Sequence, residues 1–119
     1  MDEGWSVETY ESPGREKPVD KFIKSLDASA QEKFLRMLDY LAEFGLEGVY
    51  QHTKKLKGTS LWELRILGAT NIRIFYITIT GKVILLLHGF KKKSQKTPFK
   101  EITTAKKRLE EYQSRKISN

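Results

Sequence analysis

Apolar residues recur at helical spacing in the first half of the chain. Residues 19–26 carry them at positions i, i+3, i+4 and i+7, which is one face of an amphipathic helix. Pro18 suits the first turn of that helix. A second helix is predicted to be capped by Asp27 or Ser29 and to end at Gly45. Its predicted apolar stripe is Phe34, Leu35, Leu38, Leu41 and Ala42.

Four other segments have the pattern of β-strands, with alternating or continuously apolar residues between turn residues. Gly68-Ala69 and Thr80-Gly81 are expected to form turns, and the second of these predicts a hairpin. Gly89 lies inside the last strand and suggests a bulge or a bend there. The predicted strands are residues 5–11, 61–67, 71–79 and 82–90.

A last helix is predicted after Pro98, and residues 46–60 are expected to be a connector without regular structure. The element order is then βααβββα, which predicts an α+β fold with a mainly antiparallel sheet packed on helices. The length of 119 residues suits a single domain, residues 1–119. The apolar stripe of the last helix is predicted to be Phe99, Ile102, Ala105, Leu109 and Tyr112.

The alternation in the two central strands also predicts how they pair. With Arg65 opposite Arg73, the large apolar residues share one face, while Glu63, Phe75 and both arginines share the other. We expect that second face to meet solvent. A shift by one residue would place one arginine in the core. Like charges directly opposite each other are destabilising, and an anion between the arginines would remove that cost.

Composition excludes several classes of protein. The chain has 39% hydrophobic residues, no cysteine, two separated histidines and no apolar run long enough for a membrane span. We therefore expect no disulfide, metal site, cofactor or membrane partner. The first eleven residues do not resemble a secretion signal, so a cytoplasmic location is the expectation.

The charge is divided unevenly along the chain. Residues 1–47 carry 11 acidic and 6 basic side chains, a net charge of −5, whereas residues 48–119 carry 4 and 16, a net charge of +12. Between residues 48 and 100 the only acid is Glu63, against eleven Lys and Arg. A solvated basic face is one explanation, but the concentration of charge favours an anionic partner such as nucleic acid.

The lysines are expected to join the arginines on one concave basic face. One cluster precedes the strand of Arg65, and another follows the last strand, where Lys91 and Lys93 emerge. Such lysines are suited to contacts with phosphates rather than to chemistry. The predicted RNA-binding residues are Lys54, Lys55, Lys57, Lys92 and Lys96.

Five stretches together resemble a known family. They are "KKLKG", "LWELRI", "IRIFY", "LLHGFKKKSQKTP" and the spacing of Ala105 and Arg108. Over most of the chain they are similar to the HigB-like branch of the RelE/ParE toxin superfamily. The resemblance implies a toxin of a type II toxin–antitoxin system. RelE and HigB toxins cut messenger RNA, usually on the ribosome, and a cognate antitoxin, here expected to be a helix-turn-helix protein, neutralises them.

The resemblance also implies roles for individual residues. Arg65, Arg73 and Tyr76 match family positions on the central strands, and Lys91 and Lys93 match basic positions after the last one. The chain departs from some relatives in two places. Thr97 stands near a position where relatives carry an acid, histidine or tyrosine, and Glu63 stands where some carry lysine.

The expected reaction is a metal-independent attack of the substrate 2′-hydroxyl on the neighbouring phosphorus. Arg65 and Arg73 are expected to stabilise the charge that develops on the phosphate, because guanidinium binds phosphate bidentately. Like charges favour the neutral form of a lysine, so Lys91 and Lys93 are candidates for proton transfer. His88 and Glu63 are the alternative acid or base.

Other interpretations stay open at this point. Arg65 and Arg73 are equally suited to simple ion pairs with Glu63, and His88 to a structural role. A ParE-like toxin would bind and inhibit a topoisomerase without cutting RNA, and an RNA-binding module without catalysis would keep the basic face. Tyr76 falls on the core face, where packing is its expected task.

Overall fold

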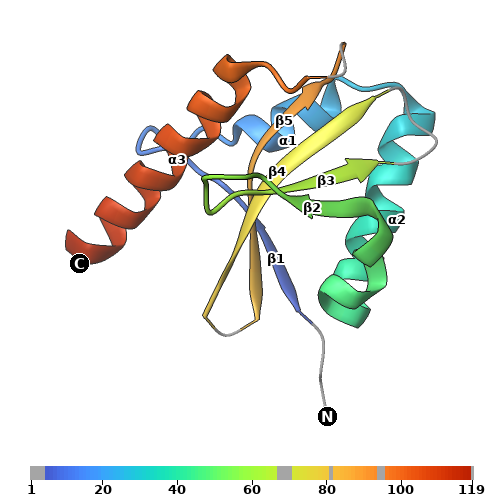
Figure 1. Cartoon of the computed structure of the whole chain (residues 1–119), viewed down its shortest axis with the longest axis horizontal. Coiled ribbons are helices and arrows are strands. Elements are labelled where there is room, and N and C mark those ends of the chain that lie inside the picture. The colour runs from blue at the N-terminus through green and yellow to red at the C-terminus, as the bar shows by residue number, and fades with distance from the viewer. Residues whose placement is uncertain (1–4, 67–70, 81, 94–95, 119) are drawn as a thin grey trace.

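A five-stranded sheet lies between helices on its two faces in the computed structural model, which describes residues 5–66, 71–80, 82–93 and 96–118 (Figure 1). None of the described helices is long and apolar enough to cross a membrane. The elements are β1 (Ser6–Thr9), α1 (Pro18–Lys24), α2 (Ala28–Phe44), the 3-10 helix η1 (Gly45–His52), β2 (Thr53–Lys55), β3 (Trp62–Ile66), β4 (Ile72–Ile79), β5 (Val83–Lys91) and α3 (Phe99–Ser118).

The strands are arranged in the order β1-β5-β4-β3-β2. Only β1 pairs in parallel, with β5, and the other three pairings are antiparallel, so the prediction of a mainly antiparallel α+β fold is confirmed. The prediction of an irregular connector over residues 46–60 is wrong, because η1 and the edge strand β2 lie there. A strand of three residues is too short for alternation to identify it.

Both central predictions about β3 and β4 can be checked. The register pairs Arg65 with Arg73, as predicted, and the face with Leu64, Ile74 and Tyr76 packs on α1 and α2. Cross-strand partners share a face, so this packing fixes the position of every side chain on the other face. The two expected turns cannot be checked in full, since residues 67–70 and 81 lie outside the described part.

The second face of the sheet is covered rather than open to solvent, which corrects the prediction. Phe75 is fully buried in a second core, which Ala105 and Leu109 of α3 complete. Glu63 lies on the same face with only 4% of its surface exposed. The sequence pattern could not show that α3 packs here, because the apolar stripe of a helix does not identify its partner.

The helix termini agree with the sequence signals, but two apolar assignments do not. Asp27 caps α2 by accepting a hydrogen bond from the backbone N–H of Ala30 at 2.8 Å, and Gly45 ends the helix with a φ of +65°. Leu35 is 55% exposed, and Met37 is buried instead. Phe99 is 82% exposed and so lies outside the packed stripe of α3. Both residues sit beside the stripe that packing selected.

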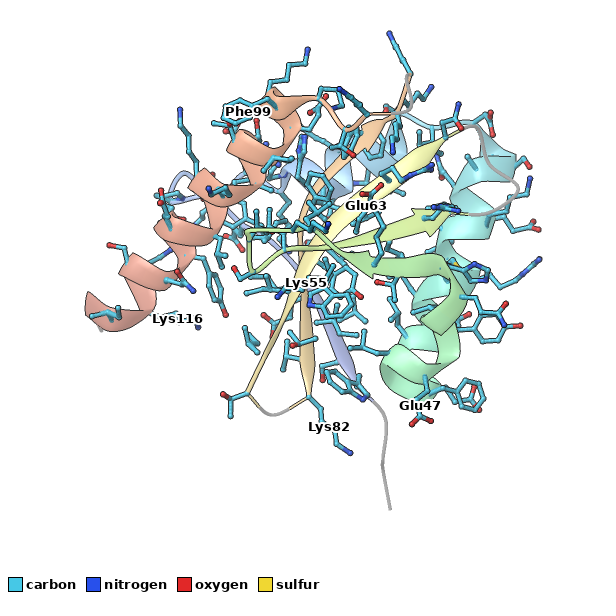
Figure 2. The ribbon with its side chains drawn as sticks, in the orientation of Figure 1. Glu47, Lys55, Glu63, Lys82, Phe99 and Lys116 are labelled. Atoms are coloured by element: carbon cyan, nitrogen blue, oxygen red, sulfur yellow. The ribbon has the colours of Figure 1, made fainter. Side chains whose placement is uncertain are left out.

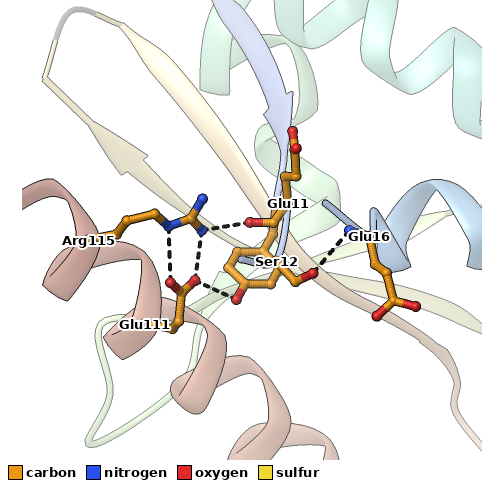
Figure 3. A network of polar contacts seen from close by, with 6 residues as sticks. Glu11, Ser12, Glu16, Glu111 and Arg115 are labelled. Atoms are coloured by element: carbon orange, nitrogen blue, oxygen red, sulfur yellow. Dashed lines mark hydrogen bonds and ion pairs between the residues drawn. The ribbon is translucent and has the colours of Figure 1, made fainter. Parts of the chain in front are cut away.

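The C-terminal half of α3 is tied to the segment after β1 by a polar network (Figure 3). Tyr10 donates its hydroxyl hydrogen to Glu111 Oε1 at 2.6 Å, and Arg115 donates to both carboxylate oxygens of Glu111 at 2.7 and 3.0 Å. Arg115 also donates to the backbone oxygen of Glu11 at 2.6 Å. These bonds connect residues about 100 positions apart and hold α3 over the sheet.

The bulge expected in the last strand lies next to Gly89. The β4–β5 register shifts between Phe75 and Tyr76, which face His88 and Leu86 respectively, so Leu87 has no partner across the strand. Gly89 itself is needed for a close approach. A Cβ atom added there would lie 2.5 Å from the ring of Phe22 on α1.

Replacing Gly89 with alanine should therefore lower the free energy of unfolding by about 1–3 kcal/mol, because the Phe22 ring must move out of a packed core. Urea denaturation measures the change. Gly14→Ala is the matched control, since the nearest atom to its added Cβ is Ser12 Oγ at 3.9 Å. Equal stability losses in the two variants would show that the close approach to Phe22 has no energetic weight.

Candidate nucleic-acid interface

A row of charged side chains crosses β2, β3 and β4 on the face of the sheet that α3 partly covers. The pairing places Lys54 opposite Glu63 and Arg65 opposite Arg73. Lys54 and Arg65 are exposed, whereas Glu63 is buried. Figure 2 shows Glu63 over the central strands. The sheet therefore brings four charged groups together on one surface.

Glu63 and Arg73 form a buried ion pair. Arg73 Nε lies 3.0 Å from Glu63 Oε2, and the two side chains are 12% and 4% exposed. The N–H direction is poor, however, so Nε has no aligned hydrogen bond, and Arg73 Nη1 donates to the backbone oxygen of Ile72 at 3.3 Å. The other carboxylate oxygen, Glu63 Oε1, is buried without a hydrogen-bond partner among the described residues. The pair thus retains hydrogen-bonding capacity that the described residues do not use.

A hollow of about 30 Å³ opens beside this carboxylate. A volume of this size suits one water-sized group. Its walls are polar, and they come from the end of η1 and from the two neighbouring strands. The lining residues are Gln51, His52, Thr53, Lys54, Glu63 and Arg65.

The two predicted catalytic arginines have different environments. Arg73 is already paired with Glu63, which is the ion pair that the sequence left open as an alternative. Arg65 is exposed and has no ion pair or hydrogen bond within the described part of the chain. Its guanidinium can therefore direct all its donors to a ligand, whereas that of Arg73 holds the carboxylate in place.

The lysines do not all converge on this surface. Lys91 lies opposite Ile72, whose side chain packs toward α2, so the register puts Lys91 on the other face at the end of β5. Lys55 lies opposite Trp62, on that same other face. Lys54 alone of the connector lysines pairs with the charged row. The predicted single basic face is therefore divided by the alternation of the strands.

The remaining predicted lysines lie around the ends of the strands. Lys57 is exposed in the loop between β2 and β3, and Lys93 and Lys96 are exposed between β5 and α3. Lys92 is partly buried, and its backbone N–H donates to the backbone oxygen of Asn71 at 2.7 Å. These positions form a basic margin rather than a reaction centre.

Both ring nitrogens of His88 are engaged. Arg108 donates to Nδ1 at 3.1 Å and to the backbone oxygen of Leu87 at 2.9 Å, and Glu101 lies 2.6 Å from Nε2. Because arginine can only donate, Nδ1 must accept, so Nε2 carries the proton and donates it to Glu101. Burial lowers the pKa of His88, and the charge of Arg108 lowers it further, although Glu101 opposes the shift. The ring also stacks on Phe90.

Sequence reasoning missed His52 and its neighbours Gln51 and Thr53. They fall in the connector, where no periodicity indicated a position for them, and only the pairing of β2 with β3 brings them to Glu63. For metals, no group of three or more potential His, Cys, Asp or Glu ligands occurs among the described residues.

Residues 21–110 match the model of the family described as phage derived protein Gp49-like (DUF891). The chain belongs to this Gp49-like family. The match includes the charged row, both cores and most of α3. Among curated proteins, none matches the sequence significantly.

The fold of this Gp49-like chain is similar to a solved structure of an archaeal RelE-RelB complex from Pyrococcus horikoshii OT3. The sequence identity is 23%, the TM-score is 0.57, and the alignment covers 81% of this chain and 100% of the other. A likeness at this identity establishes the fold alone, and it confirms the RelE-like α+β arrangement predicted from the sequence.

The buried pair should behave as one unit in stability measurements. Arg73→Met should lower the free energy of unfolding by about 3 kcal/mol or more, because it leaves a buried carboxylate unpaired. The double variant Glu63→Met/Arg73→Met should cost clearly less than that single change. Urea denaturation of the exposed pair Glu32 and Arg36 gives the control, with changes within about 0.5 kcal/mol. Additive effects at residues 63 and 73 would contradict a buried, coupled pair.

The environment of His88 predicts a pH-dependent stability. Below about pH 6.5 an unfolded chain protonates this histidine, but the folded chain resists because burial lowers the pKa of His88. The free energy of unfolding should therefore fall as the pH is lowered from 7 to 5. In His88→Gln this part of the decline should disappear, as urea denaturation across that range would show. Parallel profiles for the two proteins would count against the assigned neutral tautomer.

Proposed function

We propose that this chain is the toxin of a type II toxin–antitoxin system, of the HigB-like branch, and that it cleaves messenger RNA on the ribosome. Its membership of the Gp49-like family and the RelE-like fold support the proposal. The observation that carries it is the surface around Arg65, where an exposed guanidinium without a described partner adjoins the hollow beside Glu63.

The charged row suggests a division of tasks in the reaction. Arg65 and Lys54 hold the nonbridging oxygens of the scissile phosphate, where negative charge develops. The 2′-oxygen attacks phosphorus, the 5′-oxygen leaves, and a 2′,3′-cyclic phosphate forms. A base takes the proton of the 2′-hydroxyl and an acid protonates the departing oxygen. Arg73 acts through Glu63, as a positioning residue rather than as a second phosphate clamp.

The groups that transfer protons are drawn from four candidates. Glu63 is the one that lines the hollow together with Arg65. His88 would have to give up its bond with Glu101 or Arg108 before it could act. Lys91 and Lys93 stay candidates from the family resemblance, with a path around the end of β5. The ribosome would supply orientation, which is worth several orders of magnitude in rate.

The partners follow from the same proposal. Lys55, Lys57, Lys92 and Lys96 would bind phosphates of messenger or ribosomal RNA around the site. The similar archaeal structure is a complex of RelE with RelB, and we propose that this chain likewise has a cognate antitoxin, expected to be a helix-turn-helix protein. The proposed location is the cytoplasm.

A second candidate is an RNA-binding module without catalysis. The ion pair between Arg73 and Glu63 favours it, since one of the two expected phosphate-binding groups is already neutralised. The engaged nitrogens of His88 point the same way. Such a protein would keep the basic margin and the salt-dependent affinity that phosphate contacts produce.

Induction of the protein followed by primer extension on messenger RNA tests these alternatives. Discrete cuts in translated regions are expected for the wild-type protein. Arg65→Gln should reduce cleavage about 10²–10³-fold, because it removes a charge that stabilises the transition state. Lys107→Gln, an equal loss of charge at an exposed position on α3, should cut normally.

Other results would change the assignment. Intact messages with bound RNA would favour the non-catalytic module, and intact messages with DNA damage would point to a ParE-like topoisomerase inhibitor. Arg65→Gln that cleaves as well as the wild type would show that the proposed site is in the wrong place. Arg65 is a better target than Arg73, whose loss is expected to disturb the fold.

A further inference from the structure

The free oxygen of Glu63 places a chemical requirement on any ligand of the hollow. Glu63 is 96% buried, and its Oε1 atom has no hydrogen-bond partner among the described residues. A buried carboxylate oxygen without a partner is costly. An ionised carboxylate can only accept hydrogen bonds. The group that enters the hollow must therefore bring an O–H or N–H.

The other walls require the opposite property. Arg65 and Lys54 are cations at the mouth of the same hollow, and both are exposed. They can only donate hydrogen bonds and attract negative charge. A ligand that satisfies every group thus carries a hydroxyl or amine donor directly beside an anionic group.

The volume selects a small donor. About 30 Å³ has room for one water-sized group, so neither a nucleobase nor an amino-acid side chain of ordinary size can enter. The anion must stay outside, on Arg65 and Lys54. In an RNA chain the 2′-hydroxyl is a group of this size, and it adjoins the 3′-phosphate, whereas DNA lacks it.

We infer that the hollow beside Glu63 is a ribose-selecting subsite, in which Oε1 of Glu63 accepts a hydrogen bond from the 2′-hydroxyl while Arg65 and Lys54 bind the adjacent 3′-phosphate. This inference rests on the proposed function because it takes RNA as the ligand. It concerns binding alone, so it does not depend on cleavage. Glu63 thereby separates RNA from DNA on a surface whose other contacts are general phosphate contacts.

A titration followed by NMR tests the subsite with probes that cannot be cleaved. The probes are adenosine 3′-monophosphate, 2′-deoxyadenosine 3′-monophosphate and inorganic phosphate, with amide signals of residues 51–54 and 63–65 as the readout. The ribonucleotide should bind about tenfold more tightly than the deoxyribonucleotide, as expected for one hydrogen bond to a charged acceptor. Phosphate alone should bind no better than the deoxyribonucleotide.

Two variants separate the parts of the subsite. Glu63→Gln should reduce the ribose preference to about twofold, because a neutral amide oxygen is a weaker acceptor. Arg65→Gln should weaken both nucleotides and leave their ratio unchanged, and Lys107→Gln should alter neither. The ratio of the two affinities remains valid if a variant is partly unfolded, since a smaller folded fraction weakens both apparent affinities equally.

Each other outcome has a definite meaning. Equal affinities for the two nucleotides in the wild-type protein would overturn the inference and leave the hollow as the place of a structural water, with the phosphate site intact. An undiminished preference in Glu63→Gln would also overturn it. Binding of none of the three probes would refute the inference together with the proposed phosphate site. A ribose preference without cleavage in cells would support the inference and contradict only the nuclease.

Discussion

The register between β3 and β4 is the constraint on which the candidate site depends. Apolar side chains from both strands pack against α2 on one face, and a slip by one residue would move all of them away from that core. The hydrophobic effect therefore also fixes the polar face, although it acts on the opposite side of the sheet. Glu63, Arg65 and Arg73 lie next to one another because their apolar neighbours cannot be placed otherwise.

The packing of α3 decides how those three charges behave. The helix buries Phe75 and, with the neighbouring strands, leaves Glu63 almost without solvent contact. In such surroundings a carboxylate needs a cation, and Arg73 is the one beside it. Arg65, which lies further toward the open side, keeps its charge for solvent or a ligand. One burial gradient across a single strand pair thus separates a positioning arginine from a binding arginine.

The same helix is fastened at both ends, by different chemistry. Near its start, Glu101 and Arg108 hold the neutral ring of His88 on β5. Near its end, Glu111 and Arg115 are joined to Tyr10 and to the backbone after β1. The lysine-rich segment between β5 and α3 is therefore held at each of its flanks, although its side chains extend into solvent. A histidine that looked available for catalysis instead has a structural task.

The sequence alone was sufficient for the element types, the mainly antiparallel sheet and the pairing of Arg65 with Arg73, because these follow from local periodicity and turn chemistry. It could not reveal β2, which is too short for a pattern, or the helix that covers the second face, since an apolar stripe does not name its partner. The hollow with Glu63 and His52 likewise arises only when separate segments meet. Burial, and hence which charge is free, is a property of the assembled structure and was decided there.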